Sequence, residues 1–426
     1  MGFLHEHIIL PISDLLKGEQ VHRYLRFLRQ AEAWDEEKMQ AFQEQRFREL
    51  ICYAAREVPY YREWFQTNGH NPEAITLNQL PVINKALMRS EGINRFVARS
   101  FPESKRMLNR SGGSTGEPFS FYVSKQAYSL NTAAKLRTWY QAGYRLGDPY
   151  MKIVNDVRTS KIKAIQDRFS NCVYLPFYSI TEETLSTILG QIEKTKPLFI
   201  RSYPAPLFLL AKYRNTHLGY VHRPCRIFTT GSTLSQTWRD EIESAFGCDI
   251  IDSFSCEGTP NTYETTEHDG YHVTEAYGII EVLDEEGRPV TDGIGRVVST
   301  DLWNWAHAFI RYDTQDLVEV SQGKIKRIMG RESETLLETG GKLLTVHNFT
   351  HYFADHFSSV DGWQVVKRKD GSVEFRLVVN DQYSSSDEQR IIEHWTPRMG
   401  AMVTVSIVEA LPLMANNKHL SIIQEA

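Results

Sequence analysis

A loop rich in glycine and hydroxyl residues occupies positions 111–118, which read SGGSTGEP. Glycines let the backbone curl so that successive N–H groups point to one spot, and the neighbouring hydroxyls add further donors. Such an arrangement suits a polyphosphate. It is not a Walker loop, because the G-K-[ST] ending is absent. Taken alone, a loop of this kind is most often a plain turn, so its interpretation depends on what accompanies it.

Four further segments carry charged residues whose types could do chemistry. They are DSFSCEG at 252–258, RYDTQD at 311–316, GRESE at 330–334 and NNKH at 416–419. A carboxylate such as Glu257 can ligate a hard cation that bridges phosphate oxygens, and one such as Asp316 can accept two hydrogen bonds at once. Read singly, Glu257 is equally a capping residue, Asp316 a turn residue and Lys418 a solvated lysine.

A metal site is the alternative for one stretch of the chain. Cys248, Cys256, His268 and His272 fall within 25 residues, and the two histidines have a zinc-like interval. Residues 268–272 read HDGYH, however, which predicts a hairpin turn, and the two cysteines fall at the ends of another strand. The sequence therefore favours the hairpin, and zinc is the disfavoured interpretation.

The elements that must position these motifs alternate between strands and helices. Apolar residues at helical intervals predict helices over 35–56, 125–140 and 235–246, the first ended by the Val58–Pro59 step and the last closed by Gly247. Short apolar runs predict buried strands at 198–200, 226–228 and 249–251. This alternation indicates an α/β domain of layered sheets and helices, preceded by a mostly helical segment of about a hundred residues.

The tail of the chain has a different pattern. Strands are predicted at 363–366 and 373–379 around the turn sequence KDG, then a helix over 387–395 that stops at Pro397, then a strand at 402–408. This β-β-α-β order indicates a small α+β domain. We expect two domains, residues 1–329 and residues 330–426.

Composition narrows the class of protein. The chain has 426 residues, 41% of them hydrophobic, and a net charge of −5, so no basic field favours nucleic acid or an anionic membrane. Its five scattered cysteines indicate a reducing compartment. Neither a signal peptide nor an apolar run of about 20 residues, the length of a membrane span, is evident. The expectation is a cytoplasmic protein.

The five motifs, in this order and spacing, resemble the adenylate-forming (AMP-binding) superfamily of acyl-CoA synthetases and adenylation domains. Within it, the chain is most similar to phenylacetate–CoA ligase, to its capsular polysaccharide biosynthesis relatives and to synthetases that adenylate a deazaflavin. The resemblance covers nearly the whole chain. It implies a large N-terminal α/β adenylation domain, a small mobile C-terminal α+β domain, and the use of ATP and Mg²⁺.

The resemblance also implies a role for each motif. The phosphates of ATP would be bound by Ser111, Gly112, Gly113, Ser114, Thr115 and Gly116. The adenine and ribose would be bound by Gly231, Ser232, Ser253, Phe254 and Asp316, with Arg331 reaching the phosphates or ribose. Glu257 and Thr115 would hold Mg²⁺ and act with Lys418 in catalysis, and Glu334 would lie at the hinge. The acid would contact Ser202, Tyr203 and Thr230.

The sequence departs from the superfamily pattern in four places. Phe254-Ser255 stands where members have an aromatic–glycine pair, so either Phe254 or Ser253 would be the neighbour of the adenine. Phe119 stands where many members have a lysine, which favours the phenylacetate branch. Gln315 replaces a usual glycine, and Glu334 replaces the hinge aspartate.

Three functions follow as hypotheses. The first is activation of a carboxylic acid as an acyl-adenylate followed by transfer to CoA. The second is an amide-forming ligase with an amine acceptor, in surface or capsular polysaccharide biosynthesis. The third is a nucleotide-binding protein without turnover. All three imply small-molecule partners and no nucleic acid; the acid, the acceptor and the oligomeric state stay open.

Overall fold

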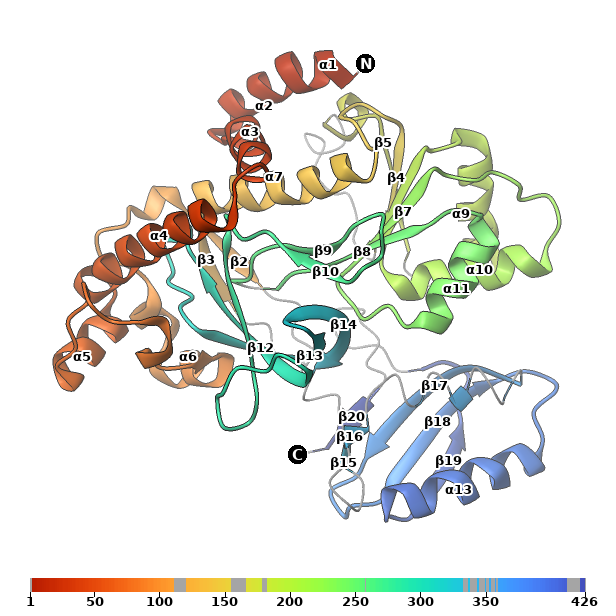
Figure 1. The fold of residues 1–426 in the computed structure, drawn as a ribbon. Coiled ribbons are helices and arrows are strands. Elements are labelled where there is room, and N and C mark those ends of the chain that lie inside the picture. Colours follow the sequence, from red (N-terminus) through yellow and green to blue (C-terminus); the bar gives the residue numbers. More distant parts are fainter. Residues whose placement is uncertain are drawn as a thin grey trace.

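The computed structural model describes residues 2–110, 120–154, 166–177, 182–256, 258–331, 336–337, 343–344, 349, 352–353, 357, 359–411 and 422–425. Its architecture is mixed α/β, with a large sheet flanked by helices and a smaller C-terminal sheet (Figure 1). This is the fold class that the sequence indicates.

Helices build the first part of the chain. They are α1 (Gly2–Leu4), η1 (His5–Ile9), α2 (Leu10–Lys17), α3 (Val21–Ala31), α4 (Glu36–Glu57), α5 (Pro59–Asn68) and α6 (Lys85–Glu91). The Asp35 side chain caps α4 by accepting a hydrogen bond of 2.8 Å from the Lys38 N–H. As predicted, α4 stops at the Val58–Pro59 step, and Pro59 then opens α5, because proline is tolerated at the first position of a helix.

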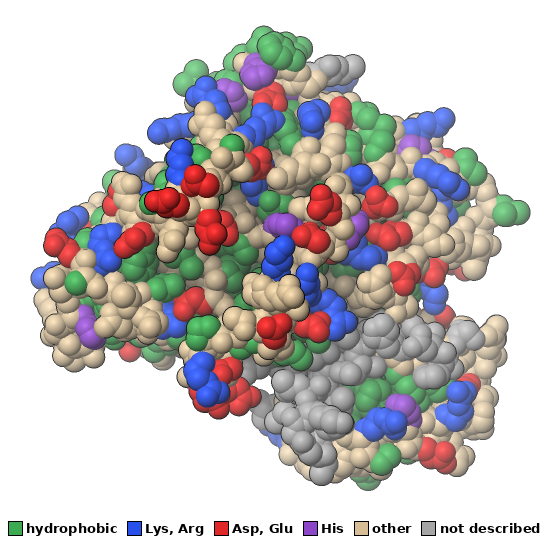
Figure 2. Space-filling view, viewed as in Figure 1, with side chains coloured by type: hydrophobic (Ala, Val, Ile, Leu, Met, Phe, Trp, Pro, Cys, Tyr) green, Lys and Arg blue, Asp and Glu red, His purple; other side chains and the backbone are tan. Residues whose placement is uncertain are grey.

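Apolar side chains remain uncovered on the first of these helices. Six large ones, in α1, η1 and α2, are exposed: Phe3, Leu4, Ile8, Ile12, Leu15 and Leu16. Figure 2 shows hydrophobic side chains gathered over this end of the molecule. No described helix is both long enough and apolar enough to cross a membrane.

Within the described residues, twelve strands form the large sheet. Its order is β11-β12-β13-β14-β10-β9-β8-β7-β6-β4-β5, with β1 beside β13. One part is parallel: β4 (Tyr150–Val154), β5 (Cys172–Pro176), β6 (Phe199–Ser202), β7 (Arg226–Thr230) and β8 (Ile250–Phe254). The antiparallel part comprises β9 (Thr262–Glu264), β10 (Tyr271–Val273), β11 (Gly278–Leu283), β12 (Gly293–Asp301), β13 (Tyr312–Ser321) and β14 (Lys324–Arg331). β1 covers Ile83–Asn84.

Two helical layers cover opposite faces of the parallel strands. α7 (Lys125–Gln141) packs on the face that carries Phe199, Phe228 and Ile251. The other face carries Ile200, Ile227 and Ile250, and is covered by three helices: α9 (Glu182–Thr195), α10 (Pro204–Thr216) and α11 (Gln236–Phe246). Neighbouring strand residues thus serve different cores, as expected for strands buried on both faces.

The C-terminal elements form a second sheet with its own core. β17 (Val360–Lys367), β18 (Val373–Val379), β19 (Val403–Ile407) and β20 (Ile422–Gln424) pair in the order β19-β18-β17-β20, with α13 (Ser385–Met399) packed on them. The short pair β15 (Leu336–Leu337) and β16 (Leu343–Leu344) precedes it. The predicted β-β-α-β unit is present, with β20 as an extra parallel strand on β17.

The predicted end of the last helix was wrong. α13 continues through Pro397 to Met399 and closes at Gly400, whose φ of 58° is left-handed. Proline removes one hydrogen bond, but burial of Trp395 and Met399 against the C-terminal core holds the last turn in place. The helix also begins before Asp387, because Ser384 and Asp387 form a capping box.

Candidate active site

The carboxyl ends of β6, β7 and β8 bring three of the predicted residues to one edge of the sheet. Ser202 is the last residue of β6, Thr230 the last of β7, and Ser253 lies beside Thr230 in register. Ligands of open parallel sheets bind at this kind of edge. Phe254 ends β8 and is half-buried.

Gly231 has a specific structural reason to be glycine. Its φ is 82°, and a Cβ placed there would lie 2.7 Å from Cε1 of Tyr203. The ring of Tyr203 therefore packs directly against the backbone that follows β7. Gly231 and Ser232 are exposed, so this turn borders an open edge of the protein.

The far face of the same strand ends holds a buried polar network. Thr229 Oγ1 donates to Asp252 Oδ1 at 2.5 Å, and the Tyr271 hydroxyl donates to Asp252 Oδ2 at 2.7 Å. Burial and the Asp252 carboxylate raise the pKa of Tyr271 well above its usual value, so its hydroxyl stays protonated. Ser202 is 1% exposed, pairs with Thr229 in register and shares the face of Ile200, which separates its side chain from Thr230.

The 311–316 motif contains an arginine that joins two segments of the fold, Arg311, and a candidate ligand-binding residue, Asp316. Arg311 forms a two-bond ion pair with Glu281, and its Nη1 donates to the carbonyl of Leu80 at 2.8 Å. Asp316 is 6% exposed, and its N–H donates to Thr314 Oγ1 at 3.1 Å. The motif therefore begins with a side chain that ties β13 to the N-terminal segment and ends on a buried carboxylate.

The structure explains the glycine that is usual before this carboxylate. Gln315 has a φ of 63°, in the left-handed region that glycine adopts without strain. Across the sheet, Asp316 pairs with Arg331 in register, so two of the predicted motifs meet on adjacent strands β13 and β14. Only the backbone of Arg331 is described.

A second glycine fixes the turn that follows Glu257. Gly258 has a φ of 70°, and a Cβ there would lie 2.4 Å from Cγ of Phe309. Its carbonyl accepts a hydrogen bond of 3.0 Å from Ser299 Oγ, while the Cys256 N–H donates to Thr259 Oγ1 at 2.7 Å. This turn is thereby packed against the segment that leads into β13.

Several predicted residues lie outside the described part of the chain. They are Ser111, Gly112, Gly113, Ser114, Thr115, Gly116, Glu257, Glu334 and Lys418. The strands that flank the glycine-rich loop are described: β2 (Arg106–Arg110) pairs antiparallel with β3 (Ser120–Ser124). The roles assigned to these nine residues stay predictions.

Residues distant in sequence hold β3 in place. Asn304 Oδ1 accepts from the Ser124 N–H at 3.0 Å, and Asn304 Nδ2 donates to the Tyr122 carbonyl at 2.9 Å. The Tyr122 N–H donates to Nδ1 of His307 at 3.3 Å. Burial lowers the pKa of His307 to about 3, so the ring is neutral, and because Nδ1 accepts a hydrogen bond the proton is on Nε2. The base of the hairpin is thus built into the core.

Three basic residues of this region were missed from the sequence. Lys135 of α7, Lys152 of β4 and Arg201 of β6 lie close together. The surrounding protein desolvates the Lys135 ammonium group, and the charges of Arg201 and Lys152 add to this effect, so that the pKa of Lys135 falls to about 8 although part of its side chain still reaches solvent. A signal was present, because Lys152 interrupts the strand YMKIV and Arg201 the strand FIRS, where a cation is unusual.

The residues considered for zinc have other contacts. His272 Nε2 lies 2.7 Å from Asp269 Oδ1, and the segment between β9 and β10 is a hairpin connection with His268 at a φ of 52°. Within the described residues, no group of three or more His, Cys, Asp or Glu side chains could hold a metal ion.

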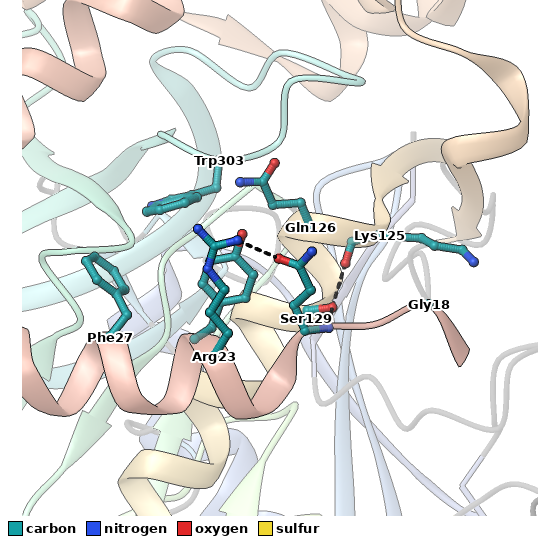
Figure 3. A pocket seen from close by; sticks show the side chains of 9 residues that line it. Gly18, Arg23, Phe27, Lys125, Gln126, Ser129 and Trp303 are labelled. Atoms are coloured by element: carbon teal, nitrogen blue, oxygen red, sulfur yellow. Dashed lines mark hydrogen bonds between the residues drawn. The ribbon is translucent and has the colours of Figure 1, made fainter. Parts of the chain in front are cut away.

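A hollow of about 350 Å³ lies at the N-terminal end of α7 (Figure 3). Its lining comes from the segment between α2 and α3, from α3, from the start of α7 and from Trp303: Gly18, Gln20, Arg23, Tyr24, Phe27, Lys125, Gln126, Ser129 and Trp303. It contains none of the residues that the sequence motifs single out.

The chain is similar in sequence to two known proteins. No family model matches the chain. Protein CapK of Staphylococcus aureus is 26% identical over 316 residues, which span 69% of this chain and 68% of CapK. Phenylacetate–coenzyme A ligase of Pseudomonas putida is 26% identical over 326 residues, which span 70% of this chain and 71% of the ligase.

Among solved structures, 2-hydroxyisobutyryl-CoA ligase in its postadenylation state has a similar fold. The TM-score is 0.72 at 16% identity, covering 91% of this chain and 90% of that one. The chain is therefore similar in sequence to Protein CapK and to phenylacetate–coenzyme A ligase, and it shares the fold of 2-hydroxyisobutyryl-CoA ligase.

Proposed function

We propose that the protein is an ATP-dependent ligase that activates a carboxylic acid as an acyl-adenylate and transfers the acyl group to CoA. The observation that carries this proposal is the likeness to phenylacetate–coenzyme A ligase over 70% of the chain. The meeting of Asp316 with Arg331 on adjacent strands, and of Thr230 with Ser253 at the sheet edge, is consistent with one nucleotide site.

The reaction has two half-reactions. A carboxylate oxygen of the acid attacks the α-phosphorus of ATP, the bond to the leaving pyrophosphate breaks, and acyl-AMP forms. The thiol of CoA then attacks the acyl carbon and AMP leaves. Because no covalent protein intermediate is required, positioned cations and N–H donors carry the catalysis.

The roles of individual residues follow the motif assignments. Ser111 to Gly116 would donate to the phosphates, Asp316 would accept from both ribose hydroxyls, and Lys418 would neutralise charge that develops at the α-phosphate. Glu257 and Thr115 offer the carboxylate and hydroxyl oxygens that Mg²⁺ prefers. When bound there with ATP, Mg²⁺ would supply charge neutralisation to the triphosphate.

The C-terminal unit would move between the half-reactions. We place the hinge at residues 330–334, with domains 1–329 and 330–426, and expect Glu334 to take part in the rotation. Five described cysteines without disulfides, together with ATP and CoA as substrates, favour the cytoplasm.

An amide-forming ligase in surface polysaccharide biosynthesis is the second candidate. The likeness to Protein CapK, at 26% identity over 316 residues, favours it. It shares the first half-reaction, and an amine replaces CoA in the second.

Release of pyrophosphate with a panel of carboxylic acids tests the shared half-reaction. We expect release with at least one acid, followed by a product of the mass of a thioester when CoA is added, or of an amide when an amine is added. No release with any acid would favour a nucleotide-binding protein without turnover. Lys418→Ala should abolish release while ATP binding is largely kept; unchanged release would remove Lys418 from the site.

Asp316 provides the test of the nucleotide site. In Asp316→Asn one oxygen that accepts from the ribose is replaced by a donor, and we expect the KM for ATP to rise at least about tenfold, equivalent to about 1.4 kcal/mol. The control is Glu319→Gln on the same strand, where an ion pair with Arg327 lies at the surface. Equal effects of the two variants would contradict the role of Asp316.

A further inference from the structure

Two cations lie side by side on the face of the sheet beneath α7. Lys152 of β4 and Arg201 of β6 are partners in register on adjacent parallel strands, so their side chains leave the same face. That face continues from Tyr150 and Phe199, which belong to the core under α7. Like charges opposite each other on a sheet are unfavourable unless something compensates them.

α7 brings a third cation over this pair. Trp139 of α7 stacks on Phe228 with ring centroids 4.7 Å apart and lies 5.7 Å from Tyr150, which fixes the helix over β4 and β7 (Figure 1). Lys135 lies one helical turn before Trp139 and so on the same side of the helix. The strand neighbour of Phe228 is Arg201.

The described surroundings of this cluster are aromatic rather than acidic. Tyr174 of β5 is opposite Lys152 in register, and its ring centroid lies 5.8 Å from Lys152 Nζ. Burial lowers the pKa of Arg201, and the groups that oppose this effect are tyrosine and cysteine side chains. Among the described residues, no ion pair involves Lys135 or Arg201, and Lys135 is exposed to solvent. Positive charge is therefore concentrated where a dissolved anion can reach it.

The cluster adjoins the edge where the acid is expected. Arg201 precedes Ser202 and Tyr203 at the end of β6, and the Tyr203 ring packs on Gly231 after β7. Arg201 pairs in register with Phe228, two residues before Thr230, so Arg201 and Thr230 lie on the same face of the sheet and an acid seated at Thr230 would lie beside the cluster.

We propose that Lys135, Lys152 and Arg201 form a subsite for a second anionic group, such as a carboxylate or phosphoryl group, on the acid that the enzyme activates. This inference rests on the proposed function, since it concerns the far end of the same substrate. Three cations from three elements can each donate hydrogen bonds to such a group. The planar guanidinium of Arg201 can donate two of them in parallel to an oxyanion.

Matched pairs of acids test the subsite: phenylacetate with 4-carboxyphenylacetate, and hexanoate with adipate. For the unchanged enzyme we expect a lower KM for the acid with the second carboxylate in pyrophosphate release. Lys135→Met should raise that KM about tenfold or more and leave the KM for the acid with one carboxylate unchanged. Lys135→Arg should keep the preference, because it keeps the charge.

The control variant is Lys194→Met, which removes an exposed lysine from α9 on the opposite face of the sheet and should change neither KM. A preference for acids with one carboxylate, or an equal effect of Lys135→Met on both members of a pair, would overturn the subsite while leaving acyl-adenylate formation intact.

Calorimetric binding of the same acids without ATP separates the two proposals. If no acid releases pyrophosphate, the proposed function fails, yet tighter binding of the dicarboxylate that is lost in Lys135→Met would still support the anionic subsite. Equal binding of both members of each pair would reject it.

Discussion

At the scale of single residues, the site depends on a few backbone conformations as much as on side chains. Gln315 occupies a left-handed conformation directly before Asp316, at φ 63°. For a residue with a Cβ this conformation costs about 1–2 kcal/mol. The strained conformation of Gln315 sets the direction of the backbone at the next residue, the buried Asp316.

Gln315→Gly should therefore stabilise the protein slightly. Relief of the strain exceeds the extra unfolded-chain entropy of glycine, about 0.4–1 kcal/mol, so we expect a gain of up to about 1 kcal/mol in the free energy of unfolding. Gln315→Val should lower it, because a branched side chain is least tolerated there. Urea unfolding midpoints measure both. A loss of stability in Gln315→Gly would show that the side chain matters more than the backbone.

His307 predicts a pH dependence of stability. Burial lowers its pKa to about 3 in the folded protein, below the unfolded value of about 6.5. The stability from the neutral ring is fully present above pH 6.5 and is lost as the pH falls toward 3, at about 1.4 kcal/mol per pH unit. Unfolding measured from pH 6 to 4 should have a shallower slope for His307→Asn than for the unchanged protein. Parallel slopes would contradict this.

At the scale of elements, many helices and strands could be predicted from capping residues and apolar patterns in the sequence. Ser235 and Gly247 bound α11 as caps that the sequence displays, and the alternation of buried strands gave β6, β7 and β8. β20 gave no such signal, because three residues gain strand structure only by pairing with β17. The Lys135, Lys152 and Arg201 cluster was missed for a different reason: Lys152 and Arg201 each interrupt an apolar strand, but the three residues meet only when α7 lies on the sheet.

The Asn304 amide makes two of the hydrogen bonds that hold the β2–β3 hairpin, and its contribution can be tested. Asn304→Asp keeps the acceptor for the Ser124 N–H but loses the donor to the Tyr122 carbonyl, leaving two acceptors facing each other. We expect the free energy of unfolding to fall by about 1–3 kcal/mol and the KM for ATP to rise, because the hairpin carries the 111–118 loop. The control is Asn68→Asp, whose amide bonds the exposed Trp64 carbonyl at 2.8 Å. A KM for ATP that stays constant would separate the hairpin from nucleotide binding.

At the scale of the whole molecule, the large sheet and the C-terminal sheet have separate hydrophobic cores. An ion pair connects the two parts, with Lys212 Nζ of α10 lying 3.5 Å from Asp361 Oδ1 of β17. Both side chains are largely solvated, so the pair contributes little to stability and is easily broken. That suits a C-terminal unit that changes position.

This ion pair allows the proposed rotation to be blocked. A carbodiimide can join Lys212 and Asp361 as an amide and fix the present arrangement. We expect pyrophosphate release and thioester formation to change by different factors in the cross-linked protein, because one arrangement cannot serve both half-reactions. The variant Lys212→Gln, which cannot be joined, is the control. If both half-reactions keep their rates after cross-linking, the rotation is not required.

The contact between Gly258 and Phe309 joins the turn after Glu257 to the segment before Asp316. Neither position can change alone: a side chain at 258 needs the space that the aromatic ring fills, and a smaller residue at 309 leaves a void beneath the turn. In related sequences these two positions should therefore vary together, so that a glycine paired with a bulky ring marks chains that keep the two parts of the proposed nucleotide site packed against each other.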